Sequence, residues 1–155
     1  MVFSKSVQRS GGQRAPRPHA ESALADPDHR PPTPDGRLIY CNAGHNPPVV
    51  VGQRGVRRLE TGGLIIGAFK ELTFAEDTTQ LDPGDVLVVF SDGVTEALNA
   101  DAIEFGEDRL LTCIDAHRGA KAAVLLDSVI DAVRAFTVGA EQSDDLTALV
   151  LRYSG

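Results

Sequence analysis

Two short acidic motifs carry the residues best suited to chemistry in this sequence. Asp92 stands in the motif Ser91-Asp92-Gly93, which directly follows an apolar run at residues 86–90. Asp144 and Asp145 directly precede another largely apolar run, at residues 146–153. A short carboxylate side chain at a strand end has few rotamers, so it can hold a hard cation such as Mg²⁺ or Mn²⁺ in fixed geometry, with water completing the octahedron. If the two strand ends lie side by side, they could share one ion.

Each motif also has a purely structural interpretation. The Asp92 carboxylate could cap a short helix over residues 93–98 by accepting its free backbone amides. Asp144 and Asp145 could form a polar turn that leads into the next strand. Because isolated Asp-Gly and Asp-Asp pairs are common in turns, spacing alone does not choose between a metal site and these alternatives.

The segments that must position these motifs include several strands. Residues 86–90 are continuously apolar, which is typical of a strand buried on both faces. Further strands are predicted at residues 37–41, 49–51, 56–59, 72–81 and 146–153. The first of these follows Asp35-Gly36, a hairpin signal that implies an earlier strand.

Two helices are predicted before the final strand. Residues 107–117 and 120–136 show helical periodicity, and Gly139 is the expected stop of the second helix. One stripe of that helix consists of Ala123, Leu126, Ile130 and Val133. Antiparallel hairpins followed by two helices and a strand indicate an α+β domain with helices packed on a sheet.

Length and charge exclude several classes of protein. The 155 residues suffice for one ordinary domain. Residues 1–34 carry five Lys/Arg and three Asp/Glu (+2), whereas residues 35–155 carry ten and nineteen (−9). A body with net charge −9 repels phosphodiester backbones, and the chain has no Trp and only 5% aromatic residues, so nucleic acid is not an expected partner.

The cysteines and the apolar runs bear on location. Cys41 and Cys113 are far apart and form no CxxC motif, which indicates neither a disulfide framework nor a zinc site and fits the reducing cytoplasm. No apolar stretch approaches the roughly 18 residues of a membrane span, and no signal-peptide core is visible. We therefore expect a cytoplasmic protein without membrane contact.

Residues 1–34 differ from the rest of the chain. Six of the nine prolines lie before Asp35, apolar residues are sparse, and no helical or strand periodicity is visible. The lack of acids in the first twenty residues superficially suits an organellar transit peptide, but a disordered Pro/Arg-rich tail is the simpler interpretation. Residues 35–155 are the predicted folded unit.

Several motifs occur together in an order that resembles one family. They are Cys41-Asn42-Ala43-Gly44-His45-Asn46-Pro47-Pro48, Leu81-Asp82-Pro83-Gly84-Asp85, Ser91-Asp92-Gly93-Val94-Thr95-Glu96-Ala97, Glu104-Phe105-Gly106 and Asp144-Asp145-Leu146-Thr147. The pattern resembles the C-terminal half of bacterial PPM-type (type 2C) protein phosphatases of the stage II sporulation protein E and sigma-factor regulator group. The resemblance covers residues 35–152 and implies an antiparallel β-sandwich with flanking helices, here incomplete.

The resemblance also implies an activity. In that family two Mg²⁺ or Mn²⁺ ions, held mainly by aspartates, activate a water that attacks phosphoserine or phosphothreonine. By position in the motifs, Asp92 and Asp144 would be metal ligands, whereas Asp145 would support the site or cap the turn. His45 lies among turn formers, so closing its loop is a better interpretation than general acid catalysis. Leu64-Ile65-Ile66-Gly67 resembles the family's Leu-Pro-Leu-Gly, with Ile65 in place of proline. This difference indicates a change in packing and not a loss of chemistry.

The main departure from the family lies upstream. The family's N-terminal half supplies two further aspartates, in Gly-Asp-aromatic and Gly-Asp-Val-Ser-Gly-like motifs, and neither motif occurs here. Asp26 and Asp28 lie among prolines and are not credible substitutes. A gene fragment, a wrong start site or an upstream frameshift would each explain this, and the chain as given is expected to be weak or inactive.

Three functional hypotheses follow. The first is a metal-dependent phosphoserine/phosphothreonine phosphatase acting on a phosphorylated regulator such as an anti-sigma-factor antagonist. The second is a catalytically dead remnant that binds a regulatory partner or forms a homodimer through an uncovered sheet. The third is a pseudogene product that does not fold stably.

Overall fold

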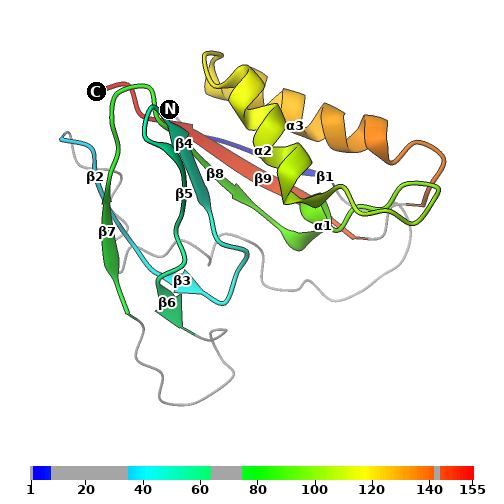
Figure 1. The fold of residues 1–155 in the computed structure, drawn as a ribbon, viewed down its shortest axis with the longest axis horizontal. Coiled ribbons are helices and arrows are strands. Elements are labelled where there is room, and N and C mark those ends of the chain that lie inside the picture. Colours follow the sequence, from blue (N-terminus) through cyan, green and yellow to red (C-terminus); the bar gives the residue numbers. More distant parts are fainter. Residues whose placement is uncertain (1, 8–34, 64–74, 142–143) are drawn as a thin grey trace.

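The computed structural model describes residues 2–7, 35–63, 75–141 and 144–155. Its central element is a five-stranded antiparallel sheet with the strand order β1-β9-β8-β4-β5 (Figure 1). The strands are β1 (Val2–Val7), β4 (Val49–Gly52), β5 (Gly55–Arg58), β8 (Val86–Phe90) and β9 (Leu146–Arg152). β8 lies in the middle, where Val88 stands opposite Val49 on one side and Val150 on the other. All five residues of β8 are buried, as the apolar run predicts.

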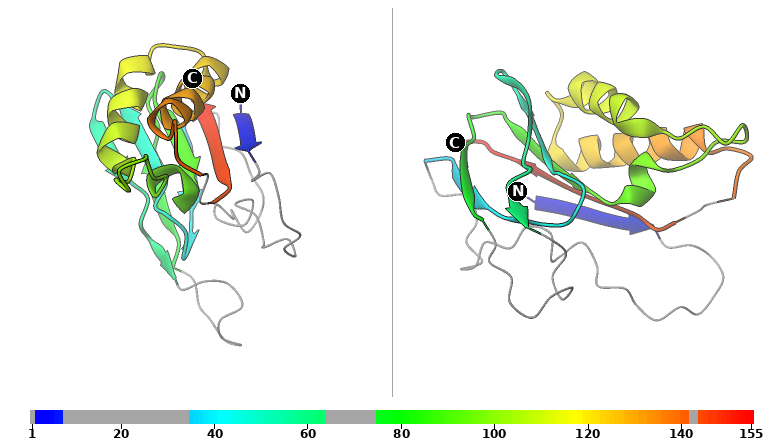
Figure 2. Two further views of the ribbon diagram at one scale, coloured as in Figure 1. Left: turned by 90° about the vertical axis from the view of Figure 1, so that its right-hand side faces the viewer. Right: turned by 60° about the horizontal axis from the view of Figure 1, so that its bottom comes forward.

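Two helices cover one face of this sheet (Figure 2). These are α2 (Gly106–His117) and α3 (Ala122–Phe136), and the larger hydrophobic core lies between them and the strands. Alternate residues of β8 point toward the helices, because Val86, Val88 and Phe90 belong to this core whereas Leu87 belongs to a second one. Each fully buried aliphatic side chain contributes about 1.5–3 kcal/mol, so this core holds the sheet end and the helices in a fixed relation.

A smaller layer packs on the opposite face of the sheet (Figure 1). It contains the antiparallel pair β2 (Arg37–Tyr40) and β7 (Asp77–Gln80), and the short parallel pair β3 (Asn42–Ala43) and β6 (Gly62–Gly63). The second core fills the space between the two layers and consists of Leu38, Tyr40, Val50, Leu59, Leu81 and Leu87. The predicted α+β architecture is therefore observed, with helices on one face and a second, smaller β layer on the other.

Three sequence-based predictions need correction. Val2–Val7 form a strand that pairs with β9, so the predicted disorder of residues 1–34 is wrong for these six residues, because pairing with a distant strand supplies the order that local composition lacks. The strand predicted at residues 72–81 is observed as Asp77–Gln80, and residues 64–74 lie outside the described part. Ala123 was predicted on the buried stripe of α3 but is half-buried, since Ala122, Leu125 and Val129 take the inner positions.

A buried ion pair fixes the β4–β5 hairpin to the turn before β8. Arg57 Nη2 donates to Asp85 Oδ2 at 2.6 Å, and the Asp85 side chain is only 2% exposed. The backbone amide of Asp82 donates to the same oxygen at 3.1 Å. A Cβ placed on Gly52 would lie 1.7 Å from Asp85 Oδ1, so the carboxylate packs directly on the hairpin backbone. Asp85, in the Asp82-Pro83-Gly84-Asp85 turn, is thus a structural residue.

Asp77 connects the strands of the smaller layer. Its carboxylate accepts hydrogen bonds from the backbone amide of Thr78 (2.7 Å), the Thr61 hydroxyl (3.1 Å) and the Tyr40 hydroxyl (3.2 Å). These donors favour the charged form and lower the pKa of Asp77, with the Thr78 amide making the largest contribution. A lowered folded-state pKa means that Asp77 stabilises the fold above its unfolded pKa of about 3.9 and loses this effect as the pH falls through the folded pKa.

We therefore expect Asp77→Asn to lower the melting temperature at neutral pH, and the difference from wild type to shrink steadily below about pH 4. Thermal unfolding of both proteins, followed by circular dichroism between about pH 3 and pH 7, measures this difference in melting temperature. Thr61→Val removes one donor only and should give a smaller difference of the same sign. A gap between Asp77→Asn and wild type that stays constant down to pH 3 would contradict the assignment.

Candidate metal centre

The sheet brings the two acidic motifs to the same end of the molecule. β8 and β9 are antiparallel neighbours, and Phe90, the last residue of β8, stands opposite Ala148 near the start of β9. Asp92 follows β8 by two positions and Asp144 precedes β9 by two, so the chain leaves one strand and enters the other at the same edge. The short helix α1 (Asp92–Thr95) lies at this end of the sheet (Figure 1). The two motifs therefore lie side by side, which is the condition under which their aspartates could share one ion.

Ser91 joins the two motifs by hydrogen bonds. Its backbone amide donates to the Thr147 carbonyl at 2.9 Å, and its hydroxyl accepts from the Thr147 amide at 3.1 Å. The same hydroxyl donates to the Asp145 carbonyl at 3.1 Å. Sequence reasoning did not identify this role: Ser91 occupies the N-cap position of α1, but its hydroxyl bonds the second motif and not the helix amides.

Gly93 allows the two segments to approach closely. It is buried, and a Cβ built on it would lie 2.3 Å from the Asp145 carbonyl oxygen and 3.5 Å from Asp144 Cβ. The first of these distances is too short for any real side chain, and its partner is a backbone atom. The glycine of Ser91-Asp92-Gly93 is therefore required by packing against the second acidic motif.

The two carboxylates are accessible and locally oriented. Asp92 Oδ1 accepts from the Gly93 amide at 2.9 Å, and Asp144 Oδ1 accepts from the Asp145 amide at 2.8 Å. Both side chains are exposed, whereas Asp145 is half-buried. The alternative in which Asp92 caps a helix holds in part: its carboxylate accepts the Gly93 amide, but Ser91 occupies the N-cap position and Asp92 is the first helical residue.

The donors at this end fit part of a metal site. Carboxylate oxygens suit Mg²⁺ or Mn²⁺, and Mg²⁺ is commonly held by one or two carboxylates while it keeps several waters. Among the described residues, no cluster of three or more His, Cys, Asp or Glu side chains could enclose an ion. Asp92 and Asp144 carry the kind of oxygen donor that such an ion takes, and the described residues gather no third His, Cys, Asp or Glu side chain with them.

The remaining candidates do not join this site. The loop that holds His45 is closed by Asn42, whose side chain accepts from the His45 amide at 2.8 Å and donates to its carbonyl at 2.9 Å. His45 Nδ1 lies 3.3 Å from the Asn46 carbonyl, which agrees with the loop-closing interpretation. The Leu64-Ile65-Ile66-Gly67 motif and both Asp26 and Asp28 lie outside the described residues.

The cysteines are not suited to nucleophilic chemistry. Burial raises the pKa of both Cys41 and Cys113, and Glu76 adds to the effect on the pKa of Cys41.

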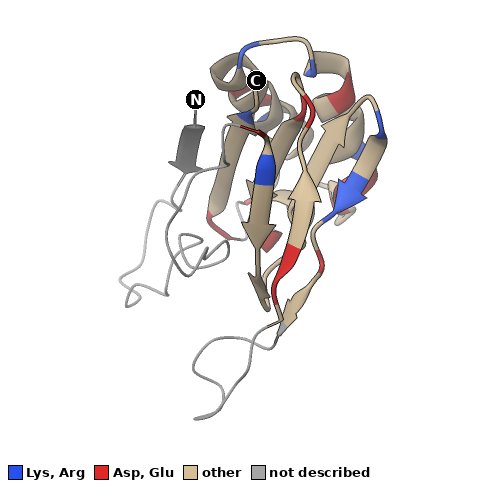
Figure 3. Cartoon of the chain, turned by 90° about the vertical axis from the view of Figure 1, so that its left-hand side faces the viewer, with Lys and Arg blue, Asp and Glu red and all other residues tan. Residues whose placement is uncertain are grey.

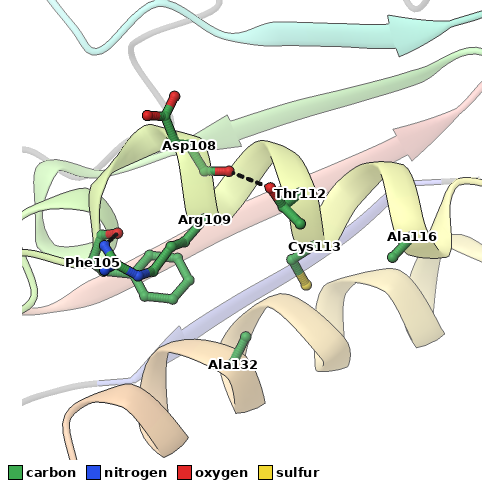
Figure 4. A pocket seen from close by; sticks show the side chains of 7 residues that line it. All are labelled: Phe105, Asp108, Arg109, Thr112, Cys113, Ala116 and Ala132. Atoms are coloured by element: carbon green, nitrogen blue, oxygen red, sulfur yellow. Dashed lines mark hydrogen bonds between the residues drawn. The ribbon is translucent and has the colours of Figure 1, made fainter.

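Cys113 lines a groove of about 560 Å³ between α2 and α3, together with Phe105, Arg109, Thr112 and Ala132 (Figure 4). The Arg109 guanidinium lies 4.8 Å from the ring centre of Phe136 and also donates to the Phe105 carbonyl. Because Arg109 interacts with Phe105 and Phe136 of the same chain, we interpret this groove as part of the packing between α2 and α3.

The arrangement of the sheets and helices is similar to that of PP2C phosphatase domains. The SiaA-PP2C domain of Pseudomonas aeruginosa superposes with a TM-score of 0.65 at 16% sequence identity, covering 77% of this chain and 48% of that chain. The PP2C phosphatase domain with a fragment of the regulatory domain of the cell fate determinant SpoIIE from Bacillus subtilis superposes with a TM-score of 0.62 at 22% identity, covering 78% of this chain and 34% of that chain. These similarities confirm the predicted PPM-type fold.

Sequence similarity shows the family to which this chain belongs. The family model described as stage II sporulation protein E matches residues 25–154, and this chain belongs to that family. Protein IcfG of Synechocystis sp. is 33% identical over 118 residues, covering 76% of this chain and 18% of that protein. Phosphoserine phosphatase RsbU of Bacillus subtilis is 30% identical over 118 residues, covering 75% and 35%. The predicted resemblance is confirmed, and the chain spans well under half the length of both curated relatives.

Proposed function

We propose that this chain is part of a metal-dependent protein serine/threonine phosphatase in which Asp92 and Asp144 bind Mg²⁺ or Mn²⁺. The observation that carries the proposal is the junction of the two acidic motifs through Ser91 and Gly93. Membership of the stage II sporulation protein E family and similarity to a phosphoserine phosphatase support the reaction class.

The residues present would bind and orient the metal. When bound, the ion lowers the pKa of water and offsets the negative charge that develops on the phosphoryl oxygens. Asp92 and Asp144 would hold it through their carboxylates, and hydrogen bonds from the Gly93 and Asp145 amides fix one oxygen of each. Ser91 keeps the two segments at a constant separation, and Asp145 supports the turn.

The proposed substrate is a phosphorylated bacterial regulatory protein, such as an anti-sigma-factor antagonist, in the cytoplasm. The free state of Cys41 and Cys113 suits a reducing compartment. Acidic and basic residues are interspersed on the face of the described residues shown in Figure 3, which fits a protein partner better than nucleic acid. No helix among the described residues is long and apolar enough to cross a membrane.

We expect the 155-residue chain by itself to bind Mn²⁺ weakly through Asp92 and Asp144 and to hydrolyse phosphoprotein or aryl phosphate slowly or not at all. Isothermal titration with Mn²⁺ should show binding that Asp92→Ala and Asp144→Ala each abolish, because each removes one of two carboxylates. Asp108→Ala, an exposed aspartate on α2, is the matched control and should leave the affinity unchanged.

Two results would require revision. Absence of Mn²⁺ and Mg²⁺ binding to the folded wild-type chain would contradict the metal site and favour the binding-module or homodimer hypothesis. Rapid turnover that Asp92→Ala abolishes would confirm the role of Asp92 and refute the expected weakness of the chain.

A further inference from the structure

A small cavity lies directly beside Asp144, between α1 and the end of α3. Its volume is about 230 Å³. Buried small or aliphatic residues line it, namely Gly93, Ala97, Val133 and Leu146. Polar residues that also line it are Arg134, Thr137, Glu141 and Asp144. Because sites for whole small molecules usually measure about 300–1,000 Å³, this cavity suits a single side chain better than a separate ligand.

Backbone hydrogen bonds hold the walls of the cavity in place. On one side, the Thr137 amide donates to the Val133 carbonyl and the Ala140 amide donates to the Thr137 carbonyl, both at 3.0 Å. Gly139, with φ of +88°, allows this tight turn after α3. On the other side, the Phe105 amide donates to the Ala97 carbonyl at 2.8 Å. These hydrogen bonds fix the backbone that carries the lining residues Ala97, Thr137 and Ala140.

We propose that this cavity binds an aliphatic side chain next to the phosphorylated residue of the substrate. The inference rests on the proposed function, which places the phosphoryl group near Asp144. Residues of an extended peptide are spaced about 3.3 Å apart, so a neighbour of the phosphorylated residue reaches a cavity that Asp144 itself lines. The buried lining residues are small or aliphatic, which favours an aliphatic side chain, and the two carboxylates of Glu141 and Asp144 outnumber the single guanidinium of Arg134, which disfavours an acidic one.

The test uses two short peptides that carry the phosphonate analogue of phosphoserine, in which a methylene group replaces the ester oxygen and prevents hydrolysis. One peptide has leucine on both sides of the analogue, and the other has glycine there. With the full chain and Mg²⁺, nuclear magnetic resonance titration should show the leucine peptide binding about tenfold more tightly, as burial of one aliphatic side chain predicts. The amide signal of Ala140, which lines the cavity away from Asp92, should shift with the leucine peptide alone.

Ala140→Leu fills the cavity and should abolish the preference for leucine while leaving the affinity for the glycine peptide unchanged. Ala132→Leu makes the same change in the groove between α2 and α3 and should retain the preference. If Ala140→Leu does not fold, Thr137→Leu fills the cavity from the end of α3 and has the same expected result.

The outcomes separate this inference from the proposed function. Equal binding of both peptides, lost in Asp144→Ala, would overturn the cavity as a subsite and leave the phosphatase proposal intact. A leucine preference that survives both cavity-filling variants would also overturn the subsite. If neither peptide binds a folded chain that does bind Mn²⁺, the subsite is overturned and the metal site stands; if Mn²⁺ does not bind either, the proposed function fails as well.

Discussion

Asp85→Ala is expected to lower the free energy of unfolding by about 3 kcal/mol, because removing one partner leaves the other charge of a largely buried pair uncompensated. The Arg57 side chain is 24% exposed, so the cost should fall at the lower end of the usual range of about 3–5 kcal/mol. Arg57 Nη1 also donates to the Gln80 carbonyl at 2.7 Å, so the guanidinium cannot simply turn toward water. Urea unfolding followed by circular dichroism measures the change.

The same turn provides the matched control. Asp82 pairs with Arg54 at 2.6 Å, but these side chains are 34% and 56% exposed. Asp82→Ala should therefore cost less than about 1 kcal/mol. In a double-mutant cycle, Asp85→Ala combined with Arg57→Ala should cost clearly less than the sum of the single changes. Equal losses for Asp82→Ala and Asp85→Ala would show that burial does not set the strength of these pairs.

Gly93→Ala is expected to destabilise the protein by about 1–3 kcal/mol and to weaken Mn²⁺ binding about tenfold or more. In a helix free of contacts the same change would stabilise by about 0.5–1 kcal/mol, so the sign itself is informative. The added methyl group meets the Asp145 carbonyl, which belongs to the backbone and cannot move without shifting the acidic motif. The two aspartates should then separate, which weakens a site that depends on both.

Gly119→Ala is the control for this change. Gly119 lies in the turn between α2 and α3, and an added Cβ would meet nothing within 4 Å. It should be neutral or slightly stabilising, since alanine restricts the unfolded chain. Unfolding curves and Mn²⁺ titrations of the two variants should therefore diverge. A Gly93→Ala protein with wild-type stability and Mn²⁺ affinity would disprove the need for close approach.

Strong periodic signals made much of the fold predictable. The apolar run of β8 and the helical stripes of α2 and α3 gave the correct element types, with bounds within two residues. β1 could not be found this way, because its order comes from pairing with β9, a strand more than a hundred residues away. The order of helices and strands along the chain was therefore easier to predict than which strands pair to form the sheet.

Of the candidate site, only the two aspartates could be predicted from the sequence. Asp92 and Asp144 could be named because each lies beside an apolar strand. The roles of Ser91 and Gly93 depend on contacts with residues 145–147, which no local pattern encodes. The buried Arg57–Asp85 pair was missed for the same reason, since its members are 28 positions apart. Their assignment as structural residues needed the three-dimensional arrangement.

The antiparallel pairing of β8 with β9 also bears on how the protein folds. Phe90 and Ala148 are paired although they are 58 positions apart in the sequence, and the three helices of the described residues lie between them. Local helices form quickly, whereas contacts of such long sequence separation carry a loop-closure entropy that slows folding. The two aspartates therefore meet only when the β8–β9 pair has closed, and a cation that needs both of them can bind only after that event. Metal binding should accordingly stabilise the closed sheet by mass action without speeding the earlier formation of α2 and α3.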